Sequence, residues 1–94
     1  MSIEFDSVKN KWNVEVRGIS FERVEAFNFA SACYQIDAQK DYSEERIKAL
    51  GFIGDRLYSL VFTERGENIR VISLRKANAR ERKKYEKESK SRMG

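Results

Sequence analysis

Two neighbouring segments predict a β-hairpin whose side chains suit a phosphate group. Residues 57–63 and 69–75 are rich in β-branched and aromatic side chains, and a short polar loop containing Gly66 joins them. Residues 46–50 alternate in the same way and predict a third strand beside the hairpin. Because side chains alternate along a strand, one face gathers cations and hydroxyl groups. These are Arg46, Lys48, Arg75, Ser59, Ser73 and Thr63. Such donors bind phosphate oxygens, although exposed cations can also serve only to keep a protein soluble.

The apolar pattern also predicts how the strands pair. We expect Thr63 to lie opposite Ile69, so that Leu57 lies opposite Arg75, and we expect Leu50 to pair with Leu57 in turn. A one-residue slip would bury Arg75 among apolar neighbours, which favours this register. The other face then forms the core. Its expected members are Tyr58, Leu60, Phe62, Ile72, Leu74, Ile47 and Ala49.

Two short helices are predicted before the sheet. Asp6 is suited to cap the first, which runs to about residue 16 with Val8 and Trp12 on one side. Gly18 suits the left-handed residue that ends this helix. Ser20 is suited to cap the second. The buried stripe of the second helix consists of Phe21, Val24 and Phe27.

Further elements complete a single α+β domain over residues 1–94. Residues 30–37 predict another strand with a buried Cys33, and residues 38–45 predict a polar loop. After the hairpin, Asn78 caps a charged helix that reaches about residue 91, and residues 88–94 form a frayed tail. The expected fold is a small antiparallel sheet packed against two N-terminal helices, with a C-terminal helix.

Composition narrows the possible functions. The chain has 94 residues, a formal charge of +4, one cysteine and no histidine. The charge favours an anionic partner, and a lone cysteine fits a reducing cytoplasm. Without histidine, a catalytic thiol or a zinc site is disfavoured, and no apolar run is long enough for a membrane span.

Acidic residues around the predicted loop suggest no metal site. They are Asp37, Asp41, Glu44 and Glu45. Their spacing lacks the turn glycine and the terminal glutamate of a calcium-binding loop. We therefore predict neither a metal nor another cofactor.

A set of residues in a characteristic order resembles the BrnT toxin family over about residues 3–86. The set is Phe5-Asp6, Lys9, Asn13, residues 18–22, Glu45-Arg46, Gly51, Arg56, residues 62–65, residues 70–77, Glu81 and Tyr85. The resemblance implies a ribonuclease toxin of a type II toxin–antitoxin system, with a fold similar to that of RelE toxins. It also implies a BrnA antitoxin that neutralises the toxin and represses their operon together with it, so that operator DNA is bound only by the complex.

One position departs from the family pattern. The family usually has Lys-His-Gly before Ile-Ser-Phe, whereas this chain has Val16-Arg17-Gly18. If that histidine transfers a proton, Arg17 cannot replace it, because a guanidinium does not titrate near neutral pH.

When the 2′-hydroxyl of the RNA acts as the nucleophile, cleavage needs three groups: a proton acceptor, a group that stabilises the phosphorane and a proton donor for the leaving oxygen. This route needs no metal. We expect Arg46 and Arg75 to clamp the phosphate, Arg56 to add a third cation and Glu81 to act as the base. Glu81 has an alternative role in an ion pair with Arg75 or Arg80. The expected RNA-binding residues are Lys9, Arg17, Lys48, Arg65, Lys76 and Arg80.

Two other functions stay open. The chain can be a non-catalytic nucleic-acid-binding module whose affinity comes from phosphate contacts. It can also act mainly by docking an antitoxin strand or helix on its sheet edge and apolar surface.

Overall fold

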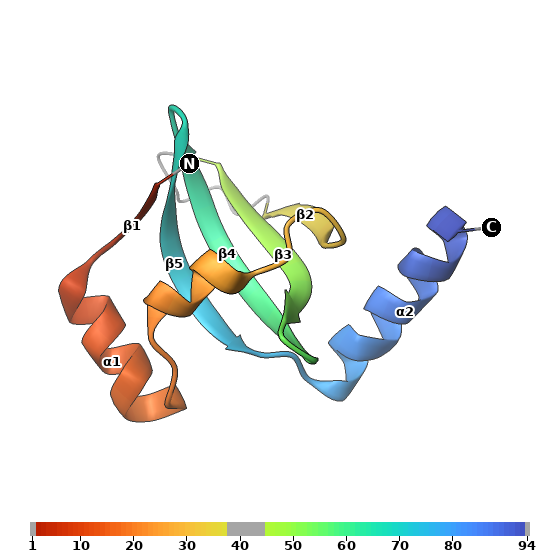
Figure 1. The fold of residues 1–94 in the computed structure, drawn as a ribbon, viewed down its shortest axis with the longest axis horizontal. Helices are drawn as coiled ribbons and strands as arrows, with labels where there is room; N and C mark the ends of the chain where they lie inside the picture. The colour runs from red at the N-terminus through yellow and green to blue at the C-terminus, as the bar shows by residue number, and fades with distance from the viewer. Residues whose placement is uncertain (1, 38–44, 94) are drawn as a thin grey trace.

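Five strands form one sheet with helices around it (Figure 1). The computed structural model describes residues 2–37 and 45–93, so Asp41, Glu44 and most of the predicted polar loop lie outside the described residues. The elements are β1 (Ile3–Phe5), α1 (Ser7–Arg17), the 3₁₀-helix η1 (Phe21–Ala26), β2 (Cys33–Asp37), β3 (Arg46–Ile53), β4 (Arg56–Arg65), β5 (Asn68–Lys76) and α2 (Ala79–Met93). Across the sheet the strand order is β1-β5-β4-β3-β2. In Figure 1, η1 crosses one face of the sheet, while α1 lies to the left of the sheet and α2 to its right in this view.

The sheet is mixed, and the prediction of a wholly antiparallel sheet was wrong. β1 pairs parallel to β5, with Ile3 opposite Ile69 and Phe5 opposite Val71. The other neighbouring strands pair antiparallel. β1 and β5 stand at opposite ends of the sequence, so no turn between them fixes their direction. The side chains of Ile3 and Phe5 instead hold β1 in place by packing against the core.

The pairing of β4 with β5 also differs from the prediction. Thr63 lies opposite Arg70 rather than Ile69, and Ser59 lies opposite Arg75. The hairpin loop is shorter than expected, because Arg65 and Asn68 already pair. Only two residues are left for the turn, and its first residue, a glycine, has the positive φ of 62° that such two-residue hairpins favour.

A β-bulge in the same pair of strands changes which side chains are buried. Val61 pairs with Ser73 whereas Phe62 pairs with Val71, so that Ile72 is the extra residue. Val71 therefore turns into the core, and Ile72, which was predicted there, is only half-buried. Sequence alternation cannot reveal such an insertion. From Ser73 to the end of β5, the pairing with β4 is shifted by two residues relative to the predicted register. A shift of two residues leaves Ser73 on its predicted face.

β3 is longer than predicted but presents the expected faces. It runs to Ile53, and Leu50 pairs with Ser59 instead of Leu57. A shift of two residues preserves the direction of every side chain. Ile47 and Ala49 accordingly pack in the core, as predicted.

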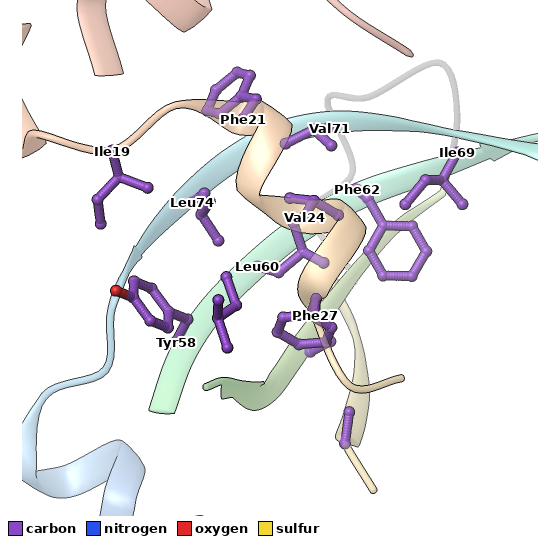
Figure 2. Close-up of a cluster of buried hydrophobic side chains, with 13 residues drawn as sticks. Ile19, Phe21, Val24, Phe27, Tyr58, Leu60, Phe62, Ile69, Val71 and Leu74 are labelled. Carbon is purple, nitrogen blue, oxygen red and sulfur yellow. The ribbon is translucent and has the colours of Figure 1, made fainter. Parts of the chain in front are cut away.

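The core lies between η1 and the apolar face of the sheet (Figure 2). In a 3₁₀-helix, residues three apart stand above one another, which aligns Phe21 and Val24 and directs the following Phe27 to the same side. Gly51 on β3 permits this packing, because a Cβ atom there would lie 2.5 Å from the Phe27 ring. The buried stripe predicted for the second helix is confirmed, as are the core positions of Tyr58, Leu60, Phe62 and Leu74.

The ends of the helices follow the predicted caps. Asp6 accepts a hydrogen bond from the Val8 amide (2.8 Å), and Gly18 ends α1 with a φ of 72°. β2 is shorter than predicted, and Cys33 at its start is buried as expected. α2 continues to Met93 and includes most of the expected tail. No helix in the described parts of the chain has the length and apolar character needed to cross a bilayer.

Candidate active site

The sheet face opposite η1 carries the predicted cations. We call it the charged face and define it by Lys48 on β3, Ser59 on β4, and Ser73 and Arg75 on β5. Ser59 lies directly opposite Arg75, so both side chains point to the same side. Strand alternation places Arg46 on this face too, two residues before Lys48.

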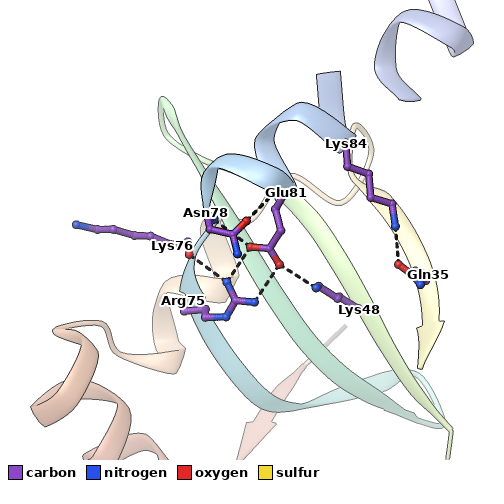
Figure 3. Close-up of polar contacts among 7 residues, drawn as sticks. All are labelled: Gln35, Lys48, Arg75, Lys76, Asn78, Glu81 and Lys84. Carbon is purple, nitrogen blue, oxygen red and sulfur yellow. Dashed lines mark hydrogen bonds and ion pairs between the residues drawn. The ribbon is translucent and has the colours of Figure 1, made fainter. Parts of the chain in front are cut away.

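One carboxylate from α2 joins two cations of this face, Arg75 and Lys48 (Figure 3). Arg75 donates from Nη1 to Oε1 of Glu81 at 2.8 Å and from Nη2 to Oε2 at 2.9 Å. Lys48 Nζ lies 2.8 Å from Oε2 of the same carboxylate. The Arg75 pair is a parallel fork of charge-assisted hydrogen bonds, the strongest geometry available to these groups. The carboxylate therefore fixes the positions of both cations.

The start of α2 explains why Glu81 reaches the sheet. The Glu81 backbone N–H donates to Oδ1 of Asn78 at 2.8 Å. In return, Oε1 of Glu81 accepts a hydrogen bond from the Asn78 backbone N–H at 3.0 Å. This reciprocal pair is a capping box, and Asn78 caps the helix as predicted. The box turns the Glu81 carboxylate back along the chain towards Arg75.

These contacts determine the charge of Glu81. The hydrogen bonds from Arg75, together with those from Lys48 and the Asn78 amide, lower the pKa of Glu81 to about 2, although its burial opposes the shift. In turn, the hydrogen bonds to Glu81 raise the pKa of Arg75. A carboxylate that holds its proton so weakly is a poor proton acceptor near neutral pH. The geometry therefore favours the ion-pair role of Glu81 over the role of general base.

Two further contacts fasten α2 beyond its first turn. Lys84 Nζ donates to Oε1 of Gln35 on β2 at 2.7 Å. The Tyr85 hydroxyl donates to the backbone carbonyl of Ser31 at 3.0 Å, and the Tyr85 ring packs edge-on against Phe52. α2 is thus attached to the sheet mainly by polar contacts.

Arg17 lies next to the charged face. Its Nη1 atom donates to Ser73 Oγ at 2.9 Å and to Asn13 Oδ1 at 3.1 Å. Ser73 precedes Arg75 by two residues on β5, so their side chains point to the same side of the strand. The position at which the family usually has histidine therefore borders the Arg75 site.

Asn13 is a structural residue to which sequence analysis assigned no role. It is 1% exposed, and its Nδ2 atom donates to the backbone carbonyls of Ile19 and Leu74, each at 2.9 Å. It joins α1 to β5 and orients Arg17 through Oδ1. The sequence signals are the place of Asn13 in the family pattern and its spacing of four residues from Arg17 on a helix.

The remaining predicted cations are dispersed. Arg56 lines a cleft of about 400 Å³ with Phe52, Arg82 and Tyr85, beyond the end of the charged face. Residues at other exposed sites are Lys9 on α1, Arg65 at the hairpin tip, Lys76 at the end of β5 and Arg80 on α2. The structure brings together Lys48, Arg75 and Glu81, with Arg17 beside them, but not the full predicted set.

The expected hydroxyl groups are less accessible than predicted. Ser59 is 2% exposed and Thr63 is 1% exposed, so neither can contact a phosphate in solution. Ser73 is half-buried and already accepts the hydrogen bond from Arg17. Neighbouring strands and helices cover these positions, which alternation along one strand cannot predict. Within residues 2–37 and 45–93, no group of three acidic, histidine or cysteine side chains is placed to hold a metal ion.

Comparison with known proteins identifies the family. A family model described as "Ribonuclease toxin, BrnT, of type II toxin-antitoxin system" matches residues 5–81. No curated protein matches the chain. The matched region contains every residue of the charged face, as well as Arg17 and Glu81. The chain belongs to the BrnT family of ribonuclease toxins of type II toxin–antitoxin systems.

Proposed function

We propose that this toxin cleaves RNA internally without a metal ion, using the 2′-hydroxyl of the substrate as nucleophile, and that the charged face is its active site. The observation that carries the proposal is the convergence of Arg75 and Lys48 on one anionic group, the Glu81 carboxylate. A scissile phosphate requires the same convergence of cations. Family membership supplies the reaction class, ribonuclease.

Arg75 and Lys48 stabilise the phosphorane in this proposal. Their side chains are 36% and 35% exposed, so both remain accessible to an RNA phosphate while bound to Glu81. A guanidinium has five N–H donors, of which two point at Glu81, and an ammonium has three. Donors held in place before the reaction are the most effective way to stabilise charge that develops in the transition state.

Glu81 is a positioning residue in this proposal. Its low pKa makes it a weak base, but its fork to Arg75 and its contact with Lys48 set the spacing of the two cations. Arg46, on the same face by strand alternation, adds positive charge beside them. The more dispersed cations serve in this proposal to bind the RNA backbone beyond the charged face; they are Lys9, Arg17, Arg56, Arg65, Lys76 and Arg80.

The electrostatics of the site support a route that needs no metal. The carboxylate at its centre is engaged by two cations, and Arg17 on α1 contacts Ser73, two residues before Arg75 on β5. A divalent cation brought to this carboxylate would have to displace Arg75 or Lys48 and would be repelled by the other.

The partner in this proposal is a BrnA-type antitoxin, which neutralises the toxin in the cytoplasm and binds operator DNA together with it. The family as a whole belongs to toxin–antitoxin systems, so the chain has an antitoxin partner. Its identity as a BrnA-type protein follows from the sequence resemblance.

A cleavage assay in excess EDTA tests the proposal. We expect the purified chain to cut single-stranded RNA and to leave fragments that end in a 2′,3′-cyclic phosphate, the product of attack by the neighbouring hydroxyl. A variant lacking Arg75 is the matched control for contaminating nucleases. RNA that stays intact in EDTA, under conditions where binding is measured, would contradict the proposal and support a non-catalytic binding module.

A further inference from the structure

Helix α1 exposes its apolar side chains and buries a polar one. Its one buried residue is Asn13, whereas its four large apolar side chains, Val8, Trp12, Val14 and Val16, are all exposed. A helix on the surface of a globular domain normally turns its apolar side inwards. α1 therefore presents to solvent the side that most helices bury.

Polar contacts hold the inner side of α1. Asn13 donates to two backbone carbonyls, and Arg17 donates to Ser73 Oγ. Asn10 accepts from the Phe21 backbone N–H at 2.8 Å. These residues occupy one side of the helix by their spacing of three and four. Polar side chains thus supply these contacts between α1 and its own domain.

Three of the exposed residues form a continuous stripe. Val8, Trp12 and Val16 are 75%, 50% and 61% exposed, and their spacing of four residues sets them in line on the outer side. The stripe spans about 12 Å at 1.5 Å per residue. We call it the α1 stripe. Aligned apolar residues on an exposed helix are typical of a protein-docking surface.

We propose that the α1 stripe docks the antitoxin through an amphipathic segment that has an apolar ridge and acidic flanks. That the chain has an antitoxin partner follows from its family. Charge indicates the nature of the segment: Lys9 and Lys11 border the stripe on its two sides, with a single glutamate, Glu15, beside them. Acidic residues on the partner would complement these lysines.

The same features disfavour two other occupants. A second copy of this chain would bring Lys9 and Lys11 against their own counterparts, and like charges across an interface oppose association. RNA bases stack on aromatic rings rather than on valine, and one face of the Trp12 ring is already covered by the Arg17 guanidinium at 4.9 Å. An apolar protein ridge matches all three residues of the stripe.

Docking on this stripe would also explain neutralisation. Arg17 contacts both the Trp12 ring and Ser73 Oγ, so this one side chain connects the stripe to the charged face. A hollow of about 260 Å³ lies between them and is lined by Trp12, Arg17, Ile72 and Ser73. An antitoxin segment on the stripe would therefore lie beside Arg75 and obstruct RNA. This last step rests on the proposed function, whereas the docking itself rests on family membership.

Trp12 is the single tryptophan of the chain and provides a direct probe of docking. The full chain, labelled with 5-fluorotryptophan, gives one ¹⁹F resonance from Trp12. The partner in the titration is the unlabelled, purified product of the small reading frame adjacent to this gene. We expect the resonance to shift and to become inaccessible to a soluble paramagnetic quencher when the complex is saturated.

Substitutions test the stripe without altering Trp12 or Arg17. The double variant Val8→Ser/Val16→Ser should weaken binding of the same antitoxin by on the order of tenfold or more, as expected for residues at the centre of an interface. Ile36→Ser is the matched control, because Ile36 is 58% exposed and lies on β2. It should change the affinity by about twofold or less. Circular dichroism melting verifies that each variant is folded.

Several results would overturn the docking proposal. They are an unchanged ¹⁹F resonance in the saturated complex, a double variant that keeps the wild-type affinity, and a wild-type chain that does not bind the adjacent product. A resonance that responds to single-stranded RNA but not to the antitoxin would identify the stripe as an RNA platform. A dimer lost on Trp12→Ala in sedimentation experiments would assign it to a second copy. Because binding is measured without cleavage, a failure of the RNA cleavage assay leaves these results interpretable.

Discussion

The two faces of the sheet are built from neighbouring residues of the same strands and do different work. The face under η1 is formed by side chains such as Ala49, Leu60 and Leu74, all fully buried. On the opposite face, Lys48 directly precedes Ala49 and Arg75 directly follows Leu74. Both cations stay about one-third exposed and contact a carboxylate. Because successive side chains of a strand point to opposite faces, residues that stabilise the fold alternate with residues that form the candidate site. Substitutions one position apart should therefore have different consequences.

The largest effect on stability should come from the apolar face. Leu60→Ala removes a fully buried side chain and should lower the free energy of unfolding by about 3 kcal/mol, through lost burial and the cavity left behind. Its cleavage rate per folded molecule should stay close to that of the wild type, because Leu60 points away from the charged face. Urea denaturation and a cleavage assay at matched folded concentration measure both. A large loss of specific activity would break the separation of the two faces.

A smaller effect, dependent on pH, should come from the carboxylate on the charged face. The folded pKa of Glu81, about 2, lies below its ordinary value of 4.5, so the unfolded chain binds the proton more tightly. The stabilisation is therefore complete above about pH 4.5 and is lost as the pH falls towards 2. Since the Arg75 partner is partly exposed and screened by solvent, Glu81→Gln should lower the free energy of unfolding by on the order of 2 kcal/mol at pH 7. This difference should shrink steadily in urea melts below pH 4.5.

Glu86→Gln supplies the control for that series, because Glu86 is exposed on the same helix. It should shift the unfolding curves little at any pH. If Glu81→Gln keeps wild-type stability at pH 7 and yet abolishes cleavage, Glu81 acts as a base and not as a positioning residue.

The smallest expected effect concerns the position next to the charged face. Arg17→His introduces a titratable imidazole beside Ser73, near Arg75. Cleavage should rise by up to about tenfold, less than the 10²–10⁴-fold that a well-positioned acid–base group supplies. The pH–rate profile should then acquire an inflection near the pKa of histidine. Unchanged or lower activity in a folded variant would show that this position does not limit the chemistry.

Local signals in the sequence predicted much of the fold. The caps at Asp6, Gly18 and Asn78 and the aromatic stripe of η1 depend on neighbouring residues, and the structure confirms them. The parallel pairing of β1 and the bulge at Ile72 depend on distant contacts, and sequence analysis missed both.

The site shows the same division. Alternation correctly set Lys48 and Arg75 on one face, and the alternative ion pair of Arg75 with Glu81 is present. Alternation gave no information on the accessibility of Ser59, because neighbouring elements bury it. Asn13 was missed as an anchor since its partners are backbone carbonyls, which no sequence motif identifies.

The most direct test of the charged face as the active site is the initial rate of RNA cleavage by Arg75→Ala in excess EDTA, per folded molecule, beside the wild type and Leu60→Ala. We predict that Arg75→Ala loses about 10²-fold or more of the wild-type rate, as for the removal of one preorganised donor, and that Arg75→Lys restores only part of it because lysine lacks the fork. Leu60→Ala should keep its rate. If Arg75→Ala cleaves as fast as the wild type, the charged face is not the active site.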